Sequence, residues 1–349
     1  MTHAGKCLSS VKRHESTVRL RCCDSGAVGR CGVVTAGGLA SLSGVHRTDQ
    51  FVTMECGSNY ASGFLKYLSD FVANIRPDDP LPVRAPSYKV TESEIDGQIL
   101  DIVHHYLNSR ECPPYVREYV GHRVWSAIRN PGLNGDGDDQ VDAANTTNHT
   151  YDAMKLIQEV TAKANTVIRE MQANLTVEEV EKLPRYYPIS HFAIKNTRRK
   201  MEDRHVIIPD LNTLYGMEYQ SPHAYYGVFD GHAGTDAAVY SAAHLHQYMI
   251  QNPQYETNPE AALKHAFHIT DTNFIKKAAK ERLKGGTTAV VALVREKRLV
   301  VAWLGDSQAL LVRRRNPVRM VEPHKPELPV SASEGPEDGR LLVGVGVWD

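Results

Sequence analysis

One apolar stretch in the second half of the chain, followed by Asp-Gly-His-Ala-Gly, constrains the fold most strongly. Residues 224–229 form a short apolar run, which predicts a buried strand. Such a strand would hold Asp230 rigidly at its end, and Gly231 has no Cβ to keep an ion away from its backbone carbonyl. Oxygen ligands of both kinds suit Mg²⁺ or Mn²⁺, and His232 belongs to a residue type that donates protons near neutral pH. The alternative is a plain strand-to-turn corner, where Asp-Gly is common.

A second charged stretch lies upstream, where three cations precede two adjacent acids. Residues 198–203 read Arg-Arg-Lys-Met-Glu-Asp, between strand-like segments at 189–194 and 205–208. Adjacent carboxylates repel each other, so an ordered pair such as Glu202 and Asp203 near a core usually has a metal ion or an arginine to neutralise it. A salt-bridged charged hairpin is the alternative interpretation.

Four blocks in this order resemble the metal-dependent protein phosphatases, the PPM family of serine/threonine phosphatases. The blocks are Arg-x-x-Met-Glu-Asp at 198–203, Val-Phe-Asp-Gly-His-x-Gly at 228–234, Gly-Gly-Thr-Thr-Ala at 285–289 and Trp-Leu-Gly-Asp-Ser at 303–307. The order and spacing of four blocks are far more specific than any one block. Within the family, residues 190–205 and 322–327 look most like the calmodulin-kinase phosphatase branch. The resemblance covers about residues 185–327.

This resemblance implies metal-dependent hydrolysis of phosphoserine and phosphothreonine in proteins, with two Mg²⁺ or Mn²⁺ ions in a complete site. It implies that Glu202 and Asp230 are acidic ligands of the two ions or lie just behind them, and that Asp230 bridges the ions. Gly231 would give its backbone oxygen. Asp203 would orient water or a further ion, and Asp306 would be a weaker ligand of a third ion.

The resemblance also assigns two residues to the substrate. Arg198 matches the arginine that binds phosphate, and its planar guanidinium suits two phosphate oxygens at once. His232 matches the general acid that protonates the leaving serine or threonine oxygen. For each of these site residues, a surface charge or a turn residue is the alternative.

The chain departs from the family pattern after Glu327. Family members carry two more metal-binding aspartates, one in an Asp-Gly block after an apolar strand and one in an Asp-Asn block. Neither block is recognisable, because Asp338-Gly339 follows Gly-Pro-Glu instead of an apolar strand. We therefore expect a truncated, poorly active phosphatase. The alternative is a non-catalytic interaction protein that uses a partial phosphatase fold.

Four segments are expected along the chain. Residues 1–57 are rich in Gly, Ser, Arg and Cys and are expected to be disordered or loosely structured. Residues 58–182 show apolar stripes at helical spacing and predict a helical region with linkers. Residues 185–327 would be the N-terminal half of the phosphatase domain, and residues 328–349 an unrelated tail.

The pattern of strands and helices gives an α+β fold class. The resemblance sharpens this to an incomplete PPM-type α/β/β/α sandwich preceded by the helical region. Because half of the sandwich would be missing, strands at 287–294 and 299–304 are expected to lack neighbours.

Composition limits the partners and the location. The formal net charge of −1 gives no electrostatic reason to expect nucleic acid or an anionic membrane as a partner. No apolar run is long enough to span a membrane, the N-terminus lacks a signal-like apolar segment, and the six cysteines show no zinc-site spacing. We expect a cytoplasmic or nuclear protein that acts on phosphoproteins, with protein kinases among the candidate partners.

Overall fold

The computed structural model describes residues 15–20, 33–36, 60–76, 79, 81, 89–129, 150–183, 189–219, 221–324 and 343–348. Statements about the structure concern these residues. No helix among them is both long enough and apolar enough to span a membrane.

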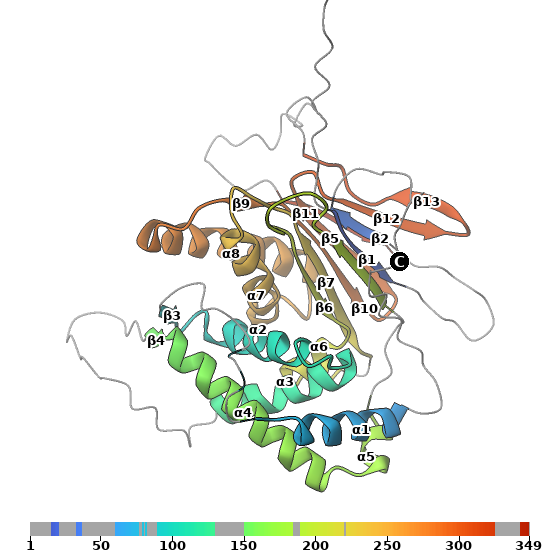
Figure 1. Ribbon diagram of the computed structural model, residues 1–349. Helices are drawn as coiled ribbons and strands as arrows, with labels where there is room; N and C mark the ends of the chain where they lie inside the picture. Colours follow the sequence, from blue (N-terminus) through green and yellow to red (C-terminus); the bar gives the residue numbers. More distant parts are fainter. Residues whose placement is uncertain are drawn as a thin grey trace, which may run out of the picture.

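Two five-stranded antiparallel sheets pack against each other (Figure 1). The first sheet has the order β13-β12-β2-β1-β5 and the second has the order β14-β11-β10-β7-β6. The strands of the first sheet are Asn316–Arg319 (β13), Gln308–Arg313 (β12), Val33–Ala36 (β2), Glu15–Leu20 (β1) and Ile189–Ile194 (β5). Those of the second are Gly344–Trp348 (β14), Arg298–Leu304 (β11), Ala289–Arg295 (β10), His223–Phe229 (β7) and Arg204–Ile208 (β6).

Strand β7 shows why the apolar run before Asp230 is buried. All seven of its residues are buried, and successive side chains point to opposite faces of the sheet. Tyr226 and Val228 enter the core between the two sheets, whereas Tyr225 and Phe229 enter the core under the helices. A strand covered on both faces reads as a continuous apolar run, and the expected buried strand is confirmed.

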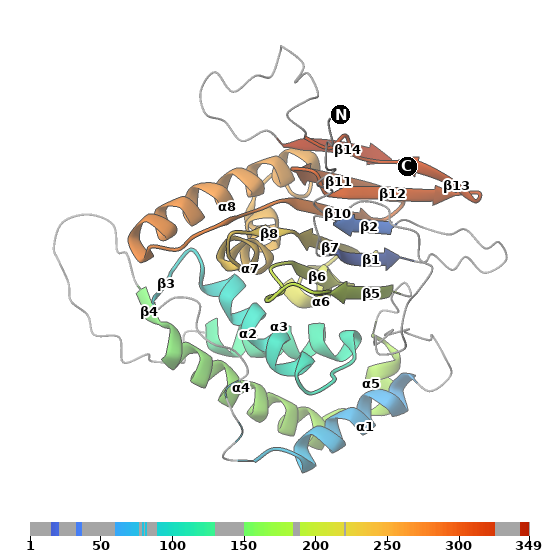
Figure 2. The same ribbon diagram turned by 45° about the horizontal axis from the view of Figure 1, so that its top comes forward.

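Two long helices cover the outer face of the second sheet (Figure 2). They are Asp236–Gln251 (α7) and Pro259–Glu281 (α8). Asn258 caps α8 by accepting the Ala261 N–H at 3.0 Å, and Pro259 is the first helical residue, as the sequence preferences of helix starts favour. The described residues thus give one helical layer on two sheets, and the α+β class is confirmed.

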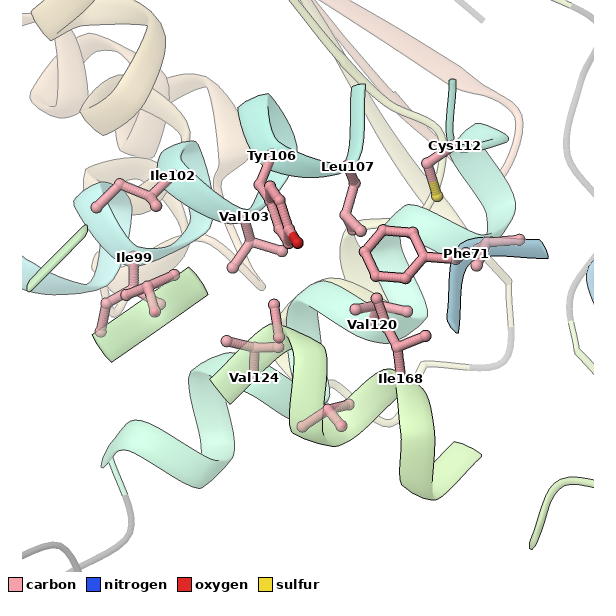
Figure 3. Close-up of a cluster of buried hydrophobic side chains, with 14 of the residues drawn as sticks. Phe71, Ile99, Ile102, Val103, Tyr106, Leu107, Cys112, Val120, Val124 and Ile168 are labelled. Carbon is pink, nitrogen blue, oxygen red and sulfur yellow. The ribbon is translucent and has the colours of Figure 1, made fainter. Parts of the chain in front are cut away.

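Helices also dominate the first half of the described chain. They are Tyr60–Ala73 (α1), Ile95–Asn108 (α2), Pro114–Arg129 (α3), Ala153–Asn174 (α4) and Val177–Glu181 (α5), with a short ladder of Lys89–Thr91 (β3) and Thr150–Asp152 (β4). Their predicted apolar stripes face one another in a common core, part of which Figure 3 shows around Phe71, Val103 and Ile168. We refer to α1 to α5 as the helical region.

Gln247 of α7 joins the helical region to the second half of the chain. Its side-chain oxygen accepts the Gly97 N–H of α2 at 2.7 Å, and its amide group donates to the Ser93 carbonyl at 2.8 Å. A Cβ on Gly97 would lie 2.4 Å from the Gln247 oxygen and 2.5 Å from the Ala243 carbonyl oxygen. Because only glycine allows this approach, α2 and α7 pack with their backbones unusually close.

A buried ion pair makes a second connection. Arg117 of α3 donates to Glu118 Oε1 at 2.9 Å and also donates to the Ile207 carbonyl of β6. The Glu118 side chain is fully buried, and its Oε2 has no hydrogen-bond partner among the described residues. Burial raises the pKa of Glu118 to about 7, although the Arg117 guanidinium opposes this shift. The contact fixes α3 against the edge of the second sheet.

The structure differs from the expectation for the first segment of the chain. Residues 15–20 and 33–36 form β1 and β2 in the middle of the first sheet, although residues 1–57 were expected to be disordered or loosely structured. Residues 344–348, near the end of the chain, form β14.

Strand β14 pairs with β11, and β10 lies between β7 and β11. The expectation that strands at 287–294 and 299–304 lack neighbours is therefore wrong. The backbone N–H and C=O groups at the edge of β11 find hydrogen-bond partners in β14, and this pairing does not depend on the side chains of β14.

We predict that Gly97→Ala destabilises the chain by about 1–3 kcal/mol, because the backbone oxygen of Ala243 cannot move away cheaply. Gly63→Ala in α1 is the matched control, since the nearest atom to its added Cβ is the Tyr115 hydroxyl at 3.5 Å. Alanine should stabilise that helix by up to about 1 kcal/mol. Urea unfolding followed by circular dichroism measures both changes. Equal effects of the two substitutions would show that the close approach of α2 and α7 does not matter.

Candidate active site

The four sequence blocks meet where β7 ends. Residues Gly231–His232 form a short strand (β8) that pairs with Gly286–Thr287 (β9). The Thr288 N–H donates to the Asp230 carbonyl at 2.9 Å, which ties the third block to the second. The Thr288 and Ser307 hydroxyls are 2.7 Å apart, which ties the fourth block to the third.

Glycines allow the remaining close approaches between these blocks. A Cβ on Gly231 would lie 2.4 Å from the Glu202 carbonyl oxygen, so the first block passes directly against the second. Gly305 has a φ of 93°, and a Cβ there would lie 2.8 Å from Thr288 Cγ2. Both positions therefore require glycine, the first because of space and the second also because of its left-handed backbone.

Three carboxyl groups share this region. Asp203 is buried and its carboxyl lies close to that of Asp230, whereas Asp306 is exposed. Burial and the negative charges of Asp203 and Asp306 together raise the pKa of Asp230 to about 6, and the nearby Arg198 opposes this shift. The structure thus brings Asp203, Asp230, Asp306 and Arg198 within electrostatic range of one another.

Glu202 and His232 lie at the edge of this group. The Glu202 backbone contacts Gly231, but no contact places its carboxylate with the three aspartates. His232 is exposed, and its Nε2 would lie 2.6 Å from a Cβ on Gly286, so its ring lies over the β9 backbone. Ala233, which follows it, has a left-handed φ of 58° and turns the chain sharply next to the histidine.

The fit of a divalent cation can be tested on the Asp203–Asp230 pair. The negative charges of the two carboxyls repel each other, and a bound cation would relieve this repulsion. Mg²⁺ typically binds through one or two carboxylates and retains several waters. In the described part of the chain, no group of three or more His, Cys, Asp or Glu side chains is arranged to hold one ion. The pair therefore fits a cation with an open coordination shell.

Sequence reasoning did not single out the Thr288 and Ser307 hydroxyls. Ser307 is almost completely buried, and its contact with Thr288 joins the turns that carry Asp230 and Asp306. The available signal was their position inside the Gly-Gly-Thr-Thr-Ala and Gly-Asp-Ser blocks. Only the three-dimensional contact reveals that they connect two acidic turns.

Comparison with known sequences identifies the class of protein. Residues 188–330 match the family described as "Protein phosphatase 2C". This segment therefore belongs to that phosphatase family, as the four blocks predicted, and the match extends slightly beyond the expected residue 327.

Curated relatives match over most of the chain. Human "Protein phosphatase 1F" is 38% identical over 287 residues, which cover 78% of this chain and 63% of the relative. Human "Protein phosphatase 1E" is 35% identical over 272 residues, which cover 78% of this chain and 36% of the relative. The chain thus spans less than two thirds of the length of these relatives.

A solved structure supports the fold alone. It is described as "Structure of a C.elegans sex determining protein", has a TM-score of 0.53 at 18% sequence identity, and the match covers 77% of this chain and 64% of that one. Since that match includes more of the chain than residues 188–330, the helical region takes part in the similarity.

Proposed function

We propose that this chain carries part of a metal-dependent phosphatase centre that removes phosphate from phosphoserine and phosphothreonine in proteins. The observation that carries this proposal is the meeting of the four blocks at the end of β7, where the Asp203 and Asp230 carboxyls and the Arg198 guanidinium lie within electrostatic range of one another. Hydrolysis of a dianionic phosphate ester requires acidic side chains that hold cations and an arginine that binds the phosphate.

Each residue of the centre has a distinct proposed role. Asp203 and Asp230 would hold a Mg²⁺ or Mn²⁺ ion, with Asp306, Glu202 and the Gly231 carbonyl as further oxygen groups nearby. When bound, such ions would neutralise phosphate charge and activate a water molecule.

Two residues would act on the substrate directly. Arg198 would orient the phosphate through two oxygens. As the bond between phosphorus and the serine or threonine oxygen breaks, the protonated His232 would give its proton to that oxygen. The exposure of His232 leaves room for a peptide substrate over the site.

We further propose that this chain is poorly active as it stands. The described residues supply two close acids and a third at longer range, and no set of three arranged around one ion. An open shell neither fixes two ions nor aligns water well. The same observation favours the second candidate function, a protein that binds phosphoproteins, protein kinases included, without turnover.

The proposal is tested by the release of phosphate from two substrates, a phosphothreonine peptide and p-nitrophenyl phosphate, with Mn²⁺ and with EDTA. We expect slow, Mn²⁺-dependent hydrolysis of both substrates. His232→Ala should slow peptide hydrolysis by about 10²–10⁴-fold because the alkoxide needs a proton. Hydrolysis of the aryl ester should change little, since nitrophenolate leaves without one.

His268→Ala, at an exposed position of α8, is the matched control and should alter neither rate. Equal losses on both substrates would exclude His232 as the acid. A folded chain without any Mn²⁺-dependent phosphate release would favour the non-catalytic interaction protein.

A further inference from the structure

Two exposed cations follow the predicted phosphate-binding arginine. Arg199 and Lys200 lie in the connection between β5 and β6, and their side chains are exposed like that of Arg198. The same connection continues into Glu202, which contacts Gly231, and into Asp203, which contacts Asp230. Arg199 and Lys200 are therefore held at the edge of the candidate site.

A second pair of exposed cations lies between α8 and β9. Arg282 ends α8 with a left-handed φ of 57°, which redirects the chain toward β9. The Lys284 carbonyl oxygen would lie 2.9 Å from a Cβ on Gly234, and its N–H donates to Asp236 Oδ2 at 3.4 Å. These contacts hold Arg282 and Lys284 beside the loop that carries His232.

The two pairs come from two different connections that both contact the segment from Gly231 to Gly234. The first pair belongs to the connection that contacts Gly231, and the second to the connection that contacts Gly234. A peptide whose phosphate lies at Asp230 and Arg198 would thus have both pairs of cations near it.

Other charges do not neutralise these cations in the described part of the chain. Lys277 lies near the C-terminal end of α8, close in sequence to the second pair. It forms ion pairs with Glu94 at 3.2 Å and with Glu281 at 3.5 Å, and the Glu94 pair directs it toward the helical region. By contrast, Arg199, Lys200, Arg282 and Lys284 form no ion pair with any described carboxylate.

We propose that these four cations, termed the basic rim, select phosphoproteins with acidic residues close in sequence to the phosphorylated serine or threonine. This inference rests on the proposed phosphatase function and adds the substrate class. An extended peptide advances about 3.3 Å per residue, so side chains two or three positions from the phosphate reach beyond the central acids. Substrate carboxylates at these positions meet the rim cations and gain an attraction that salt weakens.

The test measures binding and turnover of two fluorescent phosphothreonine peptides that differ only in flanking residues, glutamate in one and lysine in the other. Fluorescence anisotropy with Mn²⁺ at low salt should show about tenfold tighter binding of the glutamate peptide, the sum of several modest surface attractions. Arg199→Glu with Lys200→Glu should bring this preference close to unity, and so should Arg282→Glu with Lys284→Glu. Raising the salt to 0.5 M should reduce the wild-type preference.

The matched control combines Lys297→Glu and Arg313→Glu, exposed cations at the strand ends opposite to the site. It should retain the wild-type preference, despite the same change in net charge. A wild-type chain without preference for the glutamate peptide would overturn the proposal. The proposal would also be overturned if the rim variants kept the preference for the glutamate peptide, or if they weakened the binding of both peptides equally.

Hydrolysis of p-nitrophenyl phosphate separates this proposal from the proposed function. Hydrolysis without any peptide preference contradicts the basic rim alone. A preference for the glutamate peptide without hydrolysis contradicts the phosphatase activity and supports selective binding by the rim.

Discussion

Replacing Asp230 with asparagine should abolish Mn²⁺-dependent phosphate release and weaken Mn²⁺ binding at least about 100-fold. Substituting groups that merely support metal ligands already costs about 10–100-fold, and a ligand should cost more. The fold should survive, because asparagine has the shape of aspartate and the repulsion from Asp203 and Asp306 disappears. Its free energy of unfolding should equal or exceed that of the wild type.

Titration calorimetry with Mn²⁺ measures the binding, and the same sample can be unfolded in urea. We expect weak binding to the wild-type chain, since the Asp203–Asp230 pair leaves most of the shell to water. Asp70→Asn, on the exposed face of α1, is the control and should change neither quantity. Two tight Mn²⁺ sites in the wild type, or an unchanged affinity in Asp230→Asn, would contradict this account.

Replacing Arg117 with methionine should destabilise the chain by about 3–5 kcal/mol, because the buried Glu118 carboxylate loses the opposite charge that the Arg117 guanidinium supplies. Such a loss is a large part of a typical stability of about 5–15 kcal/mol. Replacing both residues, with methionine at 117 and leucine at 118, should restore most of the stability, because no charge then stays buried.

The effect should also depend on pH. The folded-state pKa of Glu118 is raised to about 7, so the contribution of its protonated form is fully present below pH 4.5 and is lost as the pH rises through 7. Without Arg117 this pKa rises further, so Arg117→Met should destabilise more at pH 8 than at pH 5. Urea unfolding at both pH values measures the difference, and a pH-independent loss would show that Glu118 does not carry the effect.

The sequence predicted the parts of the fold that local chemistry determines. The apolar run before Asp230 became β7, and Asn258 with Pro259 started α8 as their capping preferences require. The four motif blocks also met in space. The strand and the helix start depend on the side-chain pattern within a few residues. The meeting of the four blocks follows from the family resemblance, because the family's fold already contains these distant contacts.

Contacts between distant segments escaped prediction. Gly97 looks like an ordinary helix residue until Gln247, from the far half of the chain, binds its N–H. Similarly, the sequence of residues 344–348 does not predict the pairing with β11, because backbone hydrogen bonds between strands do not depend on the identity of the side chains.

The position of β1 and β2 has a consequence for the order of folding. Strand β2, the second described strand of the chain, pairs with β12, the third from last of the described strands. Contacts between such remote segments form slowly, because a long loop must close before any of its pairing is gained. On the ribosome, the helical region can form before β12 has been synthesised. The sheet that supports the Arg198 connection through β5 is thus expected to close late, so Arg198 acquires its fixed place only after β12 has been added.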